Sequence, residues 1–235
     1  MPKEENNVNL MNLFGELTFS DFIGEKNTNV SGISYDSRIV KPGNIFVAIK
    51  GFREDGHRYV SQAINSGAST IILENAIPSL KGFDACFIVD SGRRALAEIS
   101  SIFYDHPSRK FNLFGVTGTN GKTTTVFLLD SILRSIGRKT GMLGTIFCRI
   151  GDEIISNDRT TPESSDLQNL FFLMVEKKVS DVCMEVSSHS LELDRVYGCN
   201  FNVALFTNLS QDHLDFHGNM SSYFKSKMKL FHDSN

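Results

Sequence analysis

The residues of this chain with the clearest chemical potential lie in a glycine- and threonine-rich run at residues 115–125, with the sequence GVTGTNGKTTT. Gly118 and Gly121 allow main-chain conformations that other residues rarely adopt, so several N–H groups can point at one anion. Lys122 supplies a mobile positive charge for the outer phosphates of a nucleotide, and the Thr123 hydroxyl suits Mg²⁺. The run therefore predicts a phosphate-binding loop.

The elements around the run must hold this loop in place. Residues 111–116 form an apolar run that predicts a strand, and apolar residues at helical spacing follow until Gly137: Val126, Leu129, Ile132, Leu133 and Ile136. A loop between a strand and a helix N-terminus is a favourable anion site. The pattern G-x-x-x-x-G-K-[ST] is not met strictly, because Gly115 stands one residue early. The alternative is a turn in a purely structural unit.

Composition excludes several classes of protein. The 235 residues suffice for one large domain or two small ones, and a net charge of -3 argues against binding to nucleic acid. No apolar run approaches membrane-spanning length, and residues 1–10 lack a signal-peptide core. The dispersed cysteines predict reduced thiols of a cytoplasmic protein rather than a zinc site or disulfides: Cys86, Cys148, Cys183 and Cys199.

The first part of the chain predicts a small α/β domain over residues 1–108, with a linker at 106–108. Apolar periodicity predicts helices at 9–23, 57–66 and 93–104. Strands are predicted at 30–33, 45–49, 70–73 and 86–89.

The second part, residues 109–235, predicts a parallel α/β sheet with polar residues at the carboxyl ends of its strands, where ligands of such folds bind. We expect strands at 111–116, 139–147, 181–186 and 202–207, a hairpin at 149–155, a helix after the loop at 160–164, and a last helix from near Tyr223. No further strands follow to finish the sheet, so we expect this domain to be truncated and the sequence to be a fragment.

Three further stretches carry chemical groups. Glu185 ends a predicted strand, where its carboxylate suits Mg²⁺ beside the phosphate loop or simply caps the loop. His213 lies in a run with a second histidine and two acids, which suggests zinc, but the H-E-x-x-H glutamate is missing. We expect a loop that places His213 near the metal, with ordinary turn residues as the alternative. Lys225, Lys227 and Lys229 alone indicate a solvated helix face.

Taken together, these stretches resemble the Mur ligases, which join amino acids to the muramoyl peptide of the bacterial cell wall. The similarity rests on five motifs in the same order: TGTNGKTT at 117–124, TTPE at 160–163, EVSSH at 185–189, TNLSQDHLDFH at 207–217, and a lysine downstream. Residues 35–38, 42–48 and 55–59 resemble the uridine-nucleotide domain of the MurE-type members. The resemblance runs from about Val30 to the end and covers the first half of a typical member.

The resemblance implies an ATP-dependent ligase of peptidoglycan biosynthesis, and thereby a role in cell shape and cell division. Such an enzyme adds meso-diaminopimelate or L-lysine to UDP-N-acetylmuramoyl-L-alanyl-D-glutamate through an acyl phosphate, with ATP and Mg²⁺. It implies a cytoplasmic monomer. The family's C-terminal domain, which holds the amino-acid pocket, has no counterpart here, so these residues do not determine which amino acid is added. We expect this chain alone not to complete the ligation.

The resemblance also assigns roles to residues. The ATP loop comprises Gly118, Thr119, Asn120, Gly121, Lys122, Thr123 and Thr124. Mg²⁺ is assigned to Thr123, Glu185 and His213, and Lys227 stands at the lysine that becomes carbamylated; Lys122, Glu185, His213 and Lys227 are the catalytic set. The uridine nucleotide is assigned to Tyr35, Ser37, Phe52, Arg53 and Glu54, and the muramoyl peptide to Arg159, Thr160, Thr161, Ser187, Leu193 and Arg195. Arg159 and Leu193 stand where some members have Asn and Gln.

Two rival interpretations remain open at this stage. One is a folylpolyglutamate or cyanophycin-type ligase, which uses a related loop but lacks the uridine-domain motifs and the DHLD run at 212–215. The other is a nucleotide-binding remnant without catalytic activity, since only half of a typical member is matched.

Overall fold

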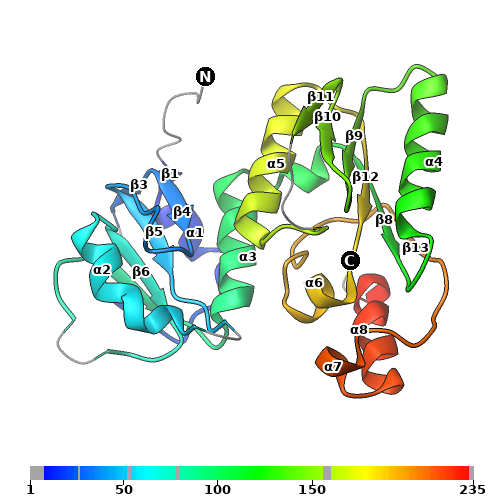
Figure 1. Ribbon diagram of the computed structural model, residues 1–235. Helices are drawn as coiled ribbons and strands as arrows, with labels where there is room; N and C mark the ends of the chain where they lie inside the picture. Colours follow the sequence, from blue (N-terminus) through cyan, green and yellow to red (C-terminus); the bar gives the residue numbers. More distant parts are fainter. Residues whose placement is uncertain (1–7, 26, 52–53, 78–79, 156–159, 233–235) are drawn as a thin grey trace. The chain divides into compact units, whose positions relative to one another are not determined.

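The computed structural model describes residues 8–25, 27–51, 54–77, 80–155 and 160–232. It divides the chain into two compact units, Met1–Phe103 and Tyr104–Asn235, each described separately below (Figure 1). The division lies before the turn at Pro107, where we expected a linker. Residues 104–108 belong to the second unit because the Tyr104 ring lies 5.5 Å from that of Phe172, and the Ser108 hydroxyl accepts a hydrogen bond from the Asn200 N–H.

The first unit is an α/β sandwich around a five-stranded sheet in the order β2-β7-β6-β5-β4. Strands β4 to β7 are parallel and β2 is antiparallel to β7. Figure 1 shows α2 and α3 on opposite sides of this sheet. The elements are β1 (Val8–Asn9), α1 (Met11–Phe14), β2 (Asp21–Gly24), β3 (Asn29–Val30), β4 (Gly32–Ser34), β5 (Asn44–Val47), η1 (Gly56–Tyr59), α2 (Val60–Asn65), β6 (Thr70–Leu73), β7 (Ala85–Ile88) and α3 (Gly92–Phe103).

The helix predicted at residues 9–23 is mostly wrong. Leu10, Leu13 and Leu17 are buried as their spacing indicated, but only the four residues of α1 are helical. The chain then enters β2, where Phe22 pairs with Phe87 across the antiparallel ladder. Pairing with a neighbouring strand therefore outweighs local periodicity at residues 21–24. The edge of β7 provides hydrogen-bond partners for main-chain N–H and C=O groups that would stay unpaired at the ends of a short helix.

The second unit is a three-layer α/β domain with a six-stranded sheet in the order β11-β10-β9-β12-β8-β13. Strands β9, β12, β8 and β13 are parallel, as predicted, and β10 and β11 form the predicted antiparallel hairpin. The elements are η2 (Pro107–Arg109), β8 (Asn112–Thr117), α4 (Lys122–Ser135), β9 (Thr140–Leu143), β10 (Cys148–Ile150), β11 (Glu153–Ile155), α5 (Ser164–Glu176), β12 (Asp181–Glu185), α6 (Ser188–Glu192), β13 (Val203–Phe206), α7 (Leu214–His217) and α8 (Met220–His232).

Alternation along the central strands builds two separate cores. Val182 and Met184 of β12 pack with Phe171 of α5, whereas Cys183 between them packs on the other face with Val126 of α4. Figure 1 accordingly shows α4 and α5 on opposite sides of the sheet. None of the helices in the described part of the chain has the length and apolar character that crossing a bilayer requires.

A buried ion pair ties α4 to the hairpin. Asp130 and Arg149 are 7% and 6% exposed, and their side chains form a direct hydrogen-bonded pair. Arg149 also donates to the Thr140 hydroxyl at 3.0 Å. Burying both charges costs hydration energy, so the pair is tolerated only while both members are present.

Substituting Asp130→Ala should therefore destabilise the fold by about 3–5 kcal/mol, because Arg149 is left buried without its partner. Denaturant unfolding followed by circular dichroism measures this loss. The double variant Asp130→Leu/Arg149→Met should recover most of it, and a single variant as stable as the parent chain would contradict the assignment.

Candidate active site

The predicted phosphate loop lies between β8 and α4 and depends on two glycines. Gly118 has φ of 144° and Gly121 has φ of 83°, both in the region that favours glycine. A Cβ on Gly118 would also lie 1.9 Å from the Thr207 hydroxyl oxygen. Gly115, by contrast, belongs to the strand, where a Cβ would lie 2.6 Å from the Phe201 ring. The early glycine of the motif therefore serves packing, not the loop.

Main-chain and side-chain donors converge where this loop meets α4. Within the part of the chain that the structure describes, the N–H groups of Gly121, Lys122 and Thr123 donate to no other group. The Lys122 ammonium donates to the carbonyls of Gly118 at 2.8 Å and Thr119 at 3.0 Å. Burial lowers its pKa, while Glu185 and Asp212 act in the opposite direction. Thr124 is exposed on the first turn of α4.

Glu185 lies beside the loop because the register of β12 against β8 places it opposite Val116. The carboxylate is 1% exposed and accepts hydrogen bonds from the Thr123 hydroxyl at 2.9 Å and the Thr145 N–H at 2.8 Å. A Cβ on Gly144 would lie 2.6 Å from the carboxylate. The predicted strand at 139–147 therefore stops at Leu143, since the chain turns at Gly144 to meet Glu185.

The Thr123 hydroxyl and the Glu185 carboxylate fit a magnesium ion. Mg²⁺ prefers hard oxygen donors, usually one or two from protein with phosphates and water completing the octahedron. The adjacent oxygens of Thr123 and Glu185 at the N-terminus of α4 are of this kind.

Within the described part of the chain, His213 forms no hydrogen bond with these oxygens. It has φ of 51°, and its ring lies 4.7 Å from His189 and 6.2 Å from Tyr223. Among the described residues, no three His, Cys, Asp or Glu side chains are close enough together to hold a metal ion. Of the three predicted metal ligands, Thr123 and Glu185 are therefore in contact with each other. His213 belongs to an aromatic cluster with His189 and Tyr223.

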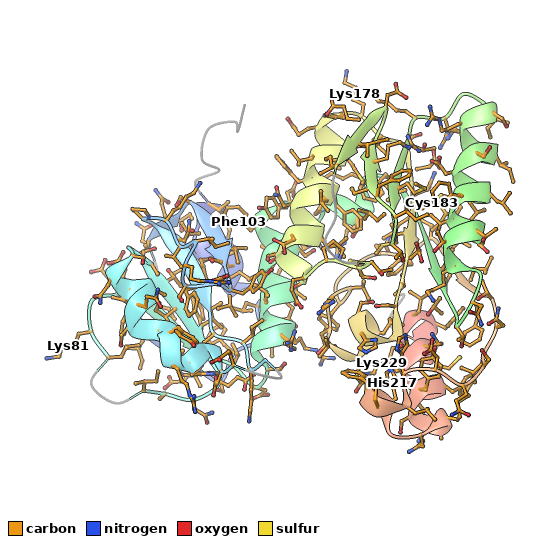
Figure 2. The ribbon with its side chains drawn as sticks, viewed as in Figure 1. Lys81, Phe103, Lys178, Cys183, His217 and Lys229 are labelled. Atoms are coloured by element: carbon orange, nitrogen blue, oxygen red, sulfur yellow. The ribbon has the colours of Figure 1, made fainter. Side chains whose placement is uncertain are left out.

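That aromatic cluster is built by α6, α7 and α8. His189 stacks 4.2 Å from Phe216 and lies 5.6 Å from His217, which Figure 2 labels on α7. His217 Nε2 is 2.9 Å from the Ser188 hydroxyl. Burial lowers the pKa of both His189 and His217, and His213 lowers each of them further. These surroundings therefore favour the neutral imidazoles of His189 and His217.

Lys227 is buried, whereas its sequence pattern alone indicated a solvated helix face. Its neighbours Lys225 and Lys229 follow the solvated pattern, and Lys229, labelled in Figure 2, pairs with Glu192 at 2.9 Å. Lys227 is instead 1% exposed and donates to the Gly118 carbonyl at 2.8 Å. Its ammonium lies 4.3 Å above the Tyr223 ring. Burial, together with the positive charge of Lys122, lowers the pKa of Lys227 to about 8.

The residues assigned to the muramoyl peptide gather at the end of β12. Thr161 donates to the Glu185 carbonyl at 3.0 Å, and its own carbonyl accepts from Arg195 at 3.2 Å. Ser187 caps α6 by accepting from the Ser190 N–H. Arg195 also lies 2.6 Å from the buried carboxylate of Glu163, a partner that the sequence motif contained but we did not assign.

The remaining members of this set contribute less. The Thr160 hydroxyl lies 3.1 Å from that of Thr145. Leu193 ends α6 and is half-buried. Arg159 lies outside the described residues.

The residues assigned to the uridine nucleotide lie in the first unit. Tyr35 and Ser37 directly follow β4, and Glu54 accepts from the Tyr59 hydroxyl at 3.0 Å. Ser37 is 7% exposed and donates to the Gln62 side chain of α2 at 3.1 Å. Phe52 and Arg53 lie outside the described residues. The described members thus lie on loops that leave the carboxyl ends of β4 and β5.

Comparison with known proteins supplies the family. A model described as the Mur ligase middle domain matches residues 116–235, and one described as the Mur ligase family catalytic domain matches residues 29–104. This chain belongs to the Mur ligase family. The expectation drawn from the five motifs is thereby confirmed.

Individual Mur ligases are also similar to this chain over most of its length. The chain is 50% identical over 208 residues to the UDP-N-acetylmuramoyl-L-alanyl-D-glutamate–2,6-diaminopimelate ligase of Caldanaerobacter subterraneus subsp. tengcongensis, covering 88% of this chain and 43% of the relative. A solved structure of an enzyme of that name matches 97% of this chain and 45% of its own, with a TM-score of 0.79 at 24% identity. The MurF ligase from Thermotoga maritima in complex with ADP matches 87% of this chain and 43% of its own, with a TM-score of 0.55 at 24% identity.

These structural matches establish the α/β fold. The chain spans less than half the length of the curated relatives it matches.

The lowered pKa of Lys227 makes stability depend on pH. Between about 8 and the ordinary value of 10.5, the unfolded chain keeps a proton on this lysine that the folded chain has released. Stability from this group therefore rises as pH increases through that window. Unfolding in denaturant at pH 7.5 and 9.5 should show a larger rise for the parent chain than for Lys227→Met. The exposed Lys225→Met is the control, and an unchanged rise in Lys227→Met would contradict the assignment.

Proposed function

We propose that this chain forms the ATP site and the uridine-nucleotide site of a ligase that adds diaminopimelate to UDP-N-acetylmuramoyl-L-alanyl-D-glutamate. The observation that carries the proposal is the convergence of Lys122, Thr123, Glu185 and Lys227 around one loop at the carboxyl edge of the second sheet. The choice of diaminopimelate is supported by the names of the relatives, which are 44% to 50% identical to this chain.

The phosphates of ATP are bound by the N–H groups at the start of α4. Gly121, Lys122 and Thr123 present N–H donors that no other described residue uses, at the positive end of a 14-residue helix, which is a favourable site for an anion. The Lys122 ammonium, now on two loop carbonyls, turns to the outer phosphates when they arrive. The ADP present in the MurF relative supports this assignment.

Thr123 and Glu185 would hold Mg²⁺, and the family resemblance also assigns His213 to the ion. When bound, the ion neutralises charge on the transferring phosphoryl group. The chain's own contribution is to orient the Glu185 carboxylate through the Thr123 hydroxyl and the Thr145 N–H.

Lys227 supplies a reactive amine. A lysine with a pKa of about 8 carries a neutral fraction near neutral pH that an ordinary lysine lacks. The neutral nitrogen attacks carbon dioxide and loses a proton, which gives the carbamate that the family resemblance implies. The resulting anion lies next to Lys122, because both ammonium groups contact the same Gly118 carbonyl.

The reaction needs charge neutralisation more than a protein nucleophile. The D-glutamate carboxylate attacks the γ-phosphate, ADP leaves, and the amine of the incoming diamino acid displaces phosphate from the acyl phosphate. Lys122 stabilises the negative charge that develops on the phosphoryl oxygens. Thr161, Ser187 and Arg195 orient the muramoyl peptide beside Glu185.

We also place the protein in the cytoplasm, as a monomer. All four cysteines are free and buried, and burial raises the pKa of Cys183 to about 12, so these thiols remain protonated and unreactive. That state suits a reducing compartment, where the UDP-linked substrate would also be found.

Lys122→Ala should abolish measurable ADP binding while the fold persists, because the hydrogen bonds of this side chain to described residues go to main-chain carbonyls of its own loop. Titration calorimetry with ADP and Mg²⁺ tests this, with Lys139→Ala as the control lysine. Unchanged affinity in Lys122→Ala would show that nucleotide binds elsewhere, and a parent chain that binds no nucleotide would overturn the proposed function.

Ser37→Ala should weaken binding of UDP-N-acetylmuramoyl-L-alanyl-D-glutamate by about 1 kcal/mol, the net value of one hydrogen bond. Since the Ser37 hydroxyl donates to Gln62, it is free to accept a bond from the ligand. NMR titration measures the change. Ser31→Ala, which changes a hydroxyl that lies before β4 and donates to the Pro42 carbonyl, should bind like the parent chain. Equal affinity for the Ser37 and Ser31 variants would remove Ser37 from the site.

A further inference from the structure

Asn208, the second residue after β13, makes three hydrogen bonds to the tip of the phosphate loop. Its carbonyl accepts from the Thr119 N–H at 2.9 Å. Its side-chain oxygen accepts from the Asn120 N–H at 3.1 Å, and its side-chain nitrogen donates to the Asn120 carbonyl at 3.0 Å. One side chain thus pairs with both main-chain groups of Asn120, as a neighbouring strand would.

The residues on either side of Asn208 support the same contact. The Thr207 hydroxyl donates to the Asn120 carbonyl at 2.7 Å, and the Ser210 N–H donates to the Thr119 hydroxyl at 3.0 Å. The Thr119 hydroxyl in turn donates to the Ser210 carbonyl at 3.1 Å. The loop tip is therefore attached to residues 207–210 along its whole length.

This attachment divides the N–H groups of the loop into two sets. Those of Thr119 and Asn120 are used by Asn208, and those of Gly121, Lys122 and Thr123 remain without a partner in the described part of the chain. A glycine-containing loop with no such attachment would sample many conformations, and a ligand would have to order it on binding.

We propose that Asn208 is a positioning residue that holds the phosphate loop in its binding conformation before the nucleotide arrives. The inference rests on the proposed nucleotide site. Asn208 acts on the loop through Asn120, with which both polar atoms of its side chain are paired. It acts by fixing Asn120, so that the three following N–H groups point at one place.

The chain offers a matched control. Asn202 stands at the other end of β13, is exposed like Asn208, and accepts from the Leu113 N–H at 2.8 Å at the start of β8. Asn202→Ala and Asn208→Ala each remove an exposed asparagine that links β13 to β8 or its loop. Neither removes core packing, so both variants should fold.

Titration calorimetry of the 235-residue chain with ADP and Mg²⁺ separates the two roles. Asn208→Ala should weaken binding about tenfold, which corresponds to about 1.4 kcal/mol. Asn202→Ala should bind like the parent chain. Equal affinity of the parent chain and Asn208→Ala, or an equal loss in both variants, would overturn the inference. A parent chain that binds no ADP would instead overturn the proposed function and the inference with it.

Hydrogen exchange followed by NMR adds a readout that begins with the parent chain itself. In the ADP-free parent chain, the Asn120 amide should already be protected, whereas those of Gly121, Lys122 and Thr123 should become protected only when ADP is added. In Asn208→Ala, exchange should rise at Asn120 and stay unchanged at Leu113. Rapid exchange at Asn120 in the ADP-free parent chain would contradict the proposal.

Discussion

The parallel pairing of β8 with β12 on one side and β13 on the other is the constraint on which the site depends. This register puts Glu185 opposite Val116 and Phe206 opposite Thr117, so both neighbouring strands end level with the loop. Glu185 then reaches the Thr123 hydroxyl, and the residues after Phe206 reach the loop tip. A shift of one residue would turn these side chains to the other face of the sheet. The chemistry of the loop thus follows from strand register.

Electrostatics impose the second constraint. Lys122 and Lys227 both donate to the Gly118 carbonyl. Burial removes much of the hydration of both ammonium groups, which lowers the pKa of each lysine. The Tyr223 ring partly compensates Lys227 through a cation–π contact, and the Tyr223 hydroxyl lies 3.2 Å from that of Thr119. Two positive charges at one carbonyl, next to free N–H donors, leave a site short of negative charge. Under the proposed function, a nucleotide phosphate, or a carbamate on Lys227, would supply this negative charge.

Sequence reasoning predicted the structure where the signal is local and failed where residues distant in the sequence decide it. The loop from Gly118 to Thr123 could be predicted because glycine spacing and a following helix are visible in one stretch. The burial of Lys227 could not, since its pattern on α8 matches that of exposed lysines, and only the fold brings Gly118 to it. The Arg195 contact with Glu163 and the pairing of β2 with β7 likewise join segments that carry no mutual signal in the sequence.

The most direct test of the central claim is a crystal structure of this chain with Mg²⁺ and a non-hydrolysable ATP analogue. The β-phosphate should lie on the N–H groups of Gly121, Lys122 and Thr123, with the ion between the Thr123 hydroxyl and Glu185. Lys122 should have left the carbonyls of Gly118 and Thr119 for the phosphates. An analogue bound away from this loop, or an ion that contacts neither oxygen, would contradict the account.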